Sequence, residues 1–145
     1  MKIPRAILLI LFPCFLFSMT CDKKELNTNS CHHSFQFNNQ SDKLLYLVIS
    51  YDYPDTGMNF QRPIFNRLTD YASPGKLETY VNYSDKCIED IMLNNAYEKM
   101  SIFVFDAKLV DSTPWTQVRQ NYMVLKRYDY SIDELRNCNF SIDYP

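Results

Sequence analysis

The sequence predicts a mainly β protein, a small antiparallel β-sandwich of about six strands with two or three short helices. Short segments of alternating or continuous apolar residues recur over residues 34–145, and turn-forming residues separate them. Aromatic residues are abundant, with 10 Phe, 11 Tyr and 1 Trp in 145 residues, so a single domain can fill its core. Glycine occurs only at Gly57 and Gly75, which excludes glycine-rich phosphate and dinucleotide loops.

Residues 1–20 are expected to be a signal peptide and not part of the fold. Lys2 and Arg5 precede an uncharged apolar run over residues 6–17, and the chain becomes polar from Ser18 onward. A basic start followed by a short apolar run is typical of secretory signals. A membrane-spanning helix needs about 20 apolar residues, so this run is too short for a permanent span.

Cys21 stands directly after this region, where the chain turns polar. A cysteine in this position resembles the lipobox of bacterial lipoproteins, in which the thiol is acylated and becomes the mature N-terminus. Ser18, Met19 and Thr20 depart from the usual box, in a way that resembles the looser boxes of Bacteroides-type bacteria. Several acyl chains anchor a protein stably, because each buried methylene contributes about 0.8 kcal/mol. We therefore predict lipidation at Cys21 and a polar tether over residues 21–33; ordinary secretion is the alternative.

The first half of the domain is expected to contain three strands. Residues 34–38 and 77–83 alternate between apolar and polar side chains, as in a half-buried strand. Residues 43–51 are almost continuously apolar, which indicates a strand buried on both faces. Residues 58–73 contain Pro63 and mixed polarity, which favours a long loop with one short edge strand at most.

The second half is expected to alternate short helices with strands. The predicted strands are 101–105, 123–130 and 139–144, and the predicted helices are 84–94 (capped by Ser84 or Asp85), 114–122 and 131–137. Thr113 and Pro114 provide a cap followed by proline at the first helical position. Ser131 and Glu134 have the spacing of a capping box, which begins the last helix.

Trp115, the only tryptophan, follows Pro114 at the start of the second predicted helix. Val118 and Tyr122 share its helical face, so we expect its ring to be largely buried against the sheet. The alternative is an exposed ring that stacks on a ligand.

Three cysteines follow Cys21, namely Cys31, Cys87 and Cys138. An exported protein reaches a compartment in which disulfides persist. The odd number allows at most one intramolecular pair. Spacing does not choose the pair, but Cys87 and Cys138 both lie inside the predicted domain and are slightly favoured. Three unpaired thiols remain the alternative.

No metal site, cofactor site or catalytic centre is expected. His32 and His33 are the only histidines, and no second His/Cys cluster follows Cys31 at metal-ligand spacing. We interpret them as an exposed pair at the end of the tether, which leaves no histidine for a Ser-His-acid nucleophile. Glu89 and Asp90 are neighbours on a predicted helix and do not face each other, so they are expected to form an ordinary solvated surface. The protein is therefore not expected to be an enzyme.

Five aromatic residues on or beside the long loop are candidates for ligand binding: Tyr51, Tyr53, Phe60, Phe65 and Tyr71. Aromatic rings on a loop can stack on a sugar or contact a partner protein. The alternative is that these rings cover one end of the sandwich. The net charge of the chain is −2 without a basic stripe, so nucleic acid is not an expected partner.

Several segments together resemble small uncharacterised lipoproteins of Bacteroides-type bacteria. They are residues 53–55 (YPD), 101–106 (SIFVFD), 113–115 (TPW), 121–129 (NYMVLKRYD), 131–135 (SIDEL) and the terminal Tyr144-Pro145. The resemblance implies an exported lipoprotein and implies no activity.

We therefore expect a lipoprotein of the bacterial cell envelope, anchored to a membrane (the outer membrane is favoured) by its lipid. Residues 34–145 are expected to act as a non-catalytic binding or accessory module for a protein or glycan ligand. The alternative function is an inhibitor or immunity-type lipoprotein that acts on one protein partner. An exposed aromatic patch would favour the first, and an acidic concavity shaped for a protein would favour the second.

Overall fold

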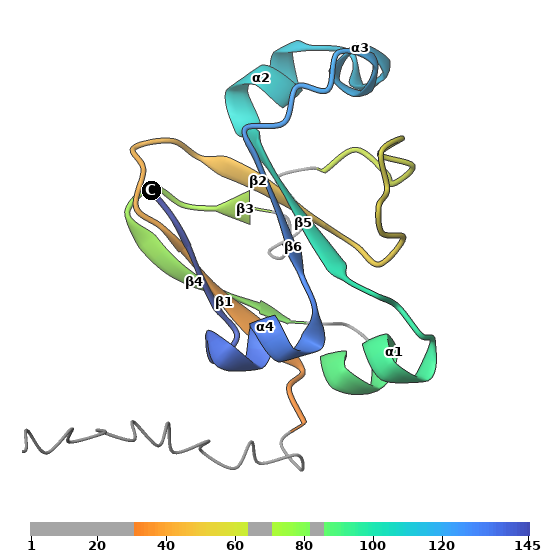
Figure 1. Cartoon of the computed structure of the whole chain (residues 1–145). Coiled ribbons are helices and arrows are strands. Elements are labelled where there is room, and N and C mark those ends of the chain that lie inside the picture. Colours follow the sequence, from red (N-terminus) through yellow and green to blue (C-terminus); the bar gives the residue numbers. More distant parts are fainter. Residues whose placement is uncertain (1–30, 64–70, 82–85) are drawn as a thin grey trace, which may run out of the picture.

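Two β-sheets face each other in the computed structural model, which describes residues 31–63, 71–81 and 86–145 (Figure 1). The three-stranded sheet has the order β4-β1-β7, and the four-stranded sheet has the order β3-β2-β5-β6. The strands are β1 (Ser34–Asn39), β2 (Leu45–Ser50), β3 (Tyr71–Ala72), β4 (Lys76–Val81), β5 (Met100–Asp106), β6 (Lys126–Tyr130) and β7 (Ser141–Tyr144). The helices are α1 (Ile88–Asn94), α2 (Ala107–Ser112), α3 (Trp115–Gln120) and α4 (Ile132–Asn137). The small, β-rich, sandwich-like fold is confirmed.

One strand pair departs from the predicted antiparallel arrangement. β1 and β7 run parallel, with Phe37 opposite Ile142, while the other strand pairs are antiparallel. β6 belongs to one sheet and β7 to the other, and α4 lies between them in the chain. A tight hairpin can join only antiparallel strands, and the parallel strands β1 and β7 are instead connected through all of the elements that lie between them in the chain.

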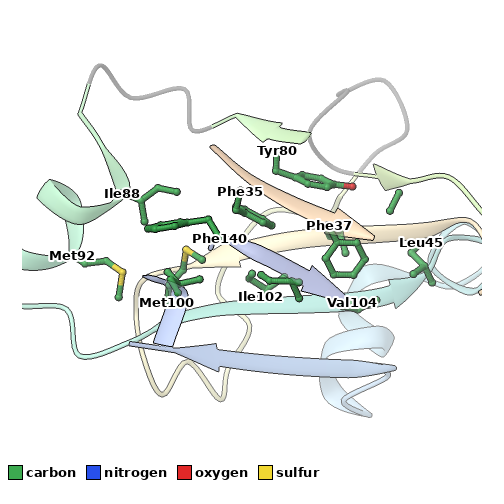
Figure 2. Packing of buried hydrophobic residues seen from close by; sticks show 14 residues of the cluster. Phe35, Phe37, Leu45, Tyr80, Ile88, Met92, Met100, Ile102, Val104 and Phe140 are labelled. Carbon is green, nitrogen blue, oxygen red and sulfur yellow. The ribbon is translucent and has the colours of Figure 1, made fainter. Parts of the chain in front are cut away.

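The main core lies between the two sheets and is closed at one end by α1 and α4. Alternation along each strand points one set of side chains inward. The buried set contains Phe35, Phe37, Leu45, Leu47, Ala72, Tyr80, Ile88, Met92, Met100, Ile102, Val104, Leu135, Phe140 and Ile142 (Figure 2). Ile88 and Met92 project from α1, and Leu135 projects from α4, so both helices are held by apolar contacts with the sheets.

A second core covers the opposite face of the four-stranded sheet. Its buried members are Tyr46, Met58, Phe103, Phe105, Ala107, Val110 and Val118. They come from β2, β5, α2, α3 and the loop after β2, so the loop and the two helices form a third layer. β2 is consequently buried on both faces, as its almost continuous apolar run predicts.

Capping residues in the sequence correctly predicted where the last helix begins. They were less successful for the starts of the other helices. In α4, the Glu134 amide donates to Ser131 Oγ, and the Ser131 amide donates to Glu134 Oε2, which confirms the capping box. α1 begins only at Ile88, after Cys87, and Ser84 and Asp85 lie outside the described residues. α2 was not predicted; Asp106 caps it by accepting a hydrogen bond from the Leu109 amide.

α3 is shorter than expected. It ends at Gln120, and Tyr122 adopts a left-handed backbone conformation with φ 47°. Tyr122 is therefore turned outward and is 45% exposed, so the expected face with Trp115 and Val118 is wrong at this residue. Trp115 itself is half-buried and packs against the second core, where we predicted a largely buried ring.

Candidate functional site

The predicted ligand-binding aromatics do not gather on one exposed patch. Tyr51 is half-buried and packs against the main core, whereas Phe60 and Tyr71 pack against the second core. Phe60 lies with its ring centroid 5.0 Å from that of Phe103. Phe65 lies outside the described residues. Three of the predicted rings therefore cover the sheets, which favours the alternative interpretation of this group.

Tyr53 lies in a different environment, between two cations. Lys99 Nζ is 5.8 Å from the centroid of the Tyr53 ring, and the Arg127 guanidinium carbon is 5.7 Å from it. Nearby in the chain, the Tyr51 ring stacks on Tyr97, with centroids 5.6 Å apart. Burial, with a smaller contribution from Tyr97, raises the pKa of Tyr51. Tyr51 and Tyr53 were predicted from the sequence as candidates for ligand binding. Their neighbours Tyr97 and Lys99 were not predicted, and the structure adds them to this group.

Arg127 is committed to structural contacts. Its Nε donates to Asp129 Oδ1 at 2.7 Å, its Nη2 donates to Ser101 Oγ at 3.1 Å, and its Nη1 donates to the Asp55 carbonyl at 3.3 Å. Burial opposes the charge, but the hydrogen bonds and electrostatic attraction of Asp129 and Tyr122 together outweigh burial, and the pKa of Arg127 is raised. This arginine ties the loop after β2 to the four-stranded sheet, so it is not available to hold a ligand.

The last residues of the predicted tether (21–33), from Cys31 onward, contact the domain. Cys31 forms a disulfide with Cys87, their Cα atoms lying 5.2 Å apart, so the favoured pairing of Cys87 with Cys138 is wrong. That preference assumed that Cys31 stays in the tether, but the chain already contacts α1 here. Cys138 is half-buried and is the free cysteine among the described residues.

His32 and Glu89 form a contact that the sequence analysis missed. Glu89 is only 4% exposed, and it accepts hydrogen bonds from the His32 amide at 3.0 Å and from His32 Nδ1 at 2.5 Å. The His32 ring also stacks on Phe140, with centroids 3.9 Å apart. The expectations of a solvated Glu89 and of two exposed histidines are therefore wrong for Glu89 and His32, while His33 is exposed as expected. A carboxylate beside a distant histidine leaves no periodic signal in the sequence.

An open groove lies where β2 begins and β5 ends, beside α2. It has a volume of about 840 Å³ and is lined by Lys43, Leu44, Asp106, Ala107, Lys108, Asp111 and Ser112. Lys43 Nζ lies 3.3 Å from Asp106 Oδ2, while Asp111 accepts a hydrogen bond from the Tyr46 hydroxyl at 3.0 Å. Lys108 is exposed. Because Leu44 and Ala107 bring apolar surface between charges of both signs, the groove can take a ligand that carries polar and apolar groups.

Within the described part of the chain, no three His, Cys, Asp or Glu side chains gather as metal ligands would. No helix among those residues is long and apolar enough to cross a membrane. Comparisons with family models, curated proteins and solved structures find no match to this chain. Cys21, the predicted lipidation site, lies outside the described residues.

Proposed function

We propose that this protein is an exported, lipid-anchored module of the bacterial cell envelope, which binds a ligand and is not an enzyme. The first part of this proposal, export from the cytosol, is supported by the disulfide between Cys31 and Cys87. Disulfides persist in oxidising compartments outside the cytosol. The bond therefore supports the signal-like pattern of residues 1–20, and Cys21 stands only ten residues before the bonded Cys31.

The lipid anchor is tested with Cys21→Ser in the full chain. Without the acylated thiol, the protein is expected to move from the membrane fraction to the soluble fraction. Cys14→Ser is the matched control, because Cys14 lies within the apolar run and is not the predicted acceptor. Detergent-dependent fractionation of the Cys21→Ser variant would contradict the proposal, and so would release of the Cys14→Ser variant.

The groove beside α2 is the surface that supports the binding half of the proposal. Lys108 is exposed there, and Lys43 contributes a second cation, opposite Asp106 and Asp111. An acidic, protein-shaped concavity would have favoured an inhibitor or immunity-type lipoprotein. The mixed charge of this groove does not favour that alternative, so we give the binding or accessory module first place.

Binding is tested by retention of envelope components on immobilised protein, comparing the wild type with Lys108→Glu. The charge reversal is expected to abolish retention of any component bound in the groove. Lys76→Glu is the matched control, since Lys76 is an exposed lysine on β4, in the other sheet. A component retained equally by the wild type and by both variants would place the binding surface elsewhere.

A further inference from the structure

The chain enters the domain at the end that carries α1. Cys31 is cross-linked to Cys87, the residue directly before α1. The Ile88 amide donates to the His32 carbonyl at 2.8 Å, which fixes the same junction a second time. In Figure 1, β1 begins at the end of the molecule where α1 and α4 lie, while α2 and α3 lie at the opposite end. A tether that starts at Cys21 therefore reaches the domain beside α1.

The length of the tether limits how the domain can sit on a membrane. Ten residue steps separate Cys21 from Cys31, which span at most about 35 Å when fully extended. A flexible chain of this length has a root-mean-square span of only about 17 Å. A domain of this size has a radius of gyration of about 13 Å, so it is roughly 30–35 Å across. At this average span, the end with α1 lies closer to the bilayer than the opposite end does.

The surface that α1 presents there carries exposed apolar and tyrosine side chains. Leu93 is 59% exposed and Tyr97 is 37% exposed. The Tyr97 amide donates to the Met92 carbonyl at 2.9 Å, and the Tyr97 ring stacks on Tyr51, so Tyr97 is held in place. We refer to Leu93, Tyr97 and Tyr51 as the α1 surface.

We infer that the α1 surface rests on the headgroup region of the membrane that holds the lipid anchor. Tyrosine suits this region because its ring is apolar and its hydroxyl is polar. A leucine contributes by burying methylene and methyl groups at the acyl boundary. The inference rests on the proposed lipidation of Cys21. Exposed Asp90 and Glu98 lie on or beside α1 and are balanced there by Lys86 and Lys99, so this surface has little net charge and the contact is with a zwitterionic lipid surface.

This orientation of the domain also determines where the groove beside α2 lies relative to the membrane. Lys43 and Leu44 precede β2, and Asp106 ends β5, at the end of the sheet next to α2. With α1 at the membrane, the groove faces away from the bilayer and is open to envelope components.

The test uses tryptophan fluorescence and lipid-borne quenchers. Leu93→Trp, made in a Trp115→Phe background, places the single tryptophan on the α1 surface. Leu125→Trp in the same background is the matched control, because Leu125 is also exposed, at 41%, and its amide bonds to Val104 nearer the α2 end. Full chains are expressed in a bacterium that processes lipoproteins. The membrane-bound protein is then reconstituted into phosphatidylcholine vesicles with and without brominated acyl chains.

Bromolipid is expected to quench the Leu93→Trp protein at least about twofold more strongly than the Leu125→Trp protein, because only the first probe reaches the acyl boundary. Tyr97→Trp in the same background gives a second probe if Leu93→Trp fails to fold. Equal quenching at the two ends, in protein that remains membrane-bound, overturns the inference and leaves the lipid anchor standing. A wild-type protein that never enters the membrane fraction overturns both.

Discussion

At the residue scale, Glu89 is unusual because its carboxylate is buried, at the junction between α1 and the start of the domain. Burial by itself would raise its pKa, but the hydrogen bonds from His32 outweigh burial, and the pKa of Glu89 lies below its ordinary value of 4.5. A carboxyl group with a lowered pKa stabilises the folded state above its unfolded pKa. That contribution is lost as the pH falls through the folded value.

Glu89→Gln is expected to lower the free energy of unfolding by about 1–3 kcal/mol at pH 7, since a buried charged hydrogen bond is removed. At pH 3 the difference between the variant and the wild type should shrink, because below pH 4.5 the carboxyl group takes up a proton in the unfolded wild-type chain more readily than in the folded state. Urea unfolding at both pH values measures this change. Glu98→Gln, at an exposed glutamate, is the control. A loss that is the same at pH 7 and pH 3 would exclude the electrostatic explanation.

Trp115 is stabilised by ring contacts and not by a hydrogen bond. Its centroid lies 5.9 Å from that of Phe60 and 5.6 Å from that of Phe105. The indole Nε1 is buried and has no hydrogen-bond partner among the described residues. Trp115→Ala should therefore cost about 3 kcal/mol, whereas Trp115→Phe should cost only about 1 kcal/mol. Chemical unfolding of both variants tests the pair, and equal losses would show that ring packing is not the cause.

At the element scale, the disulfide between Cys31 and Cys87 closes a loop with a sequence separation of 56 residues. The loop contains β1, β2, β3 and β4 and ends at α1. α1 has no side-chain hydrogen bond at its N-terminus among the described residues. The first helical amide, Ile88, is instead satisfied by the His32 carbonyl. The cross-link therefore holds the N-terminal segment where it completes the helix.

Cys31→Ser is expected to destabilise the protein by about 2–4 kcal/mol, because a loop of this length restricts the unfolded chain by about 4 kcal/mol. Reductant should have a similar effect on the wild type and none on the variant. Cys138→Ser is the control, since Cys138 is free. The measurement is thermal or urea unfolding under oxidising conditions. A Cys31→Ser protein as stable as the wild type would show that this cross-link contributes nothing.

At the scale of the whole molecule, Tyr128 joins the two sheets. It projects from β6 toward the main core, and its hydroxyl donates to the Asp143 carbonyl on β7 at 2.8 Å. Burial, followed by the nearby Tyr130, Tyr144 and Asp143, raises the pKa of Tyr128 to about 12. The folded state thus favours the neutral phenol, so stability is kept below pH 10 and lost as the pH rises from 10 toward 12.

Tyr128→Phe is expected to cost about 1 kcal/mol at pH 8, where the hydrogen bond is lost. Between about pH 10 and 11.5 the variant should lose less stability than the wild type, because one phenol with a raised pKa is gone. Urea midpoints across this pH range measure the two slopes. Tyr53→Phe, which keeps the ring and removes a half-buried phenol outside the contact between β6 and β7, controls for removal of a phenol. Parallel slopes for Tyr128→Phe and the wild type would contradict the assigned cause.

The strands and the last helix could be predicted from the sequence, because their signals lie within a few residues of one another. Alternation places Phe35 and Phe37 on one face of β1, and the nearly unbroken apolar run of β2 indicates burial on both sides. Ser131 and Glu134 cap α4 by contacts three residues apart. Such local geometry is the same wherever the segment lies in the fold.

Only the tertiary structure decided which distant segments meet. It brings Cys31 to Cys87, His32 to Glu89, and β1 to β7 in a parallel pair. It also divides the predicted aromatics between two cores and opens the groove beside α2. These arrangements depend on how the two sheets and the third layer bury their apolar faces together. Packing acts between residues that are far apart in the chain. Periodicity and spacing alone therefore do not predict which segments pack together.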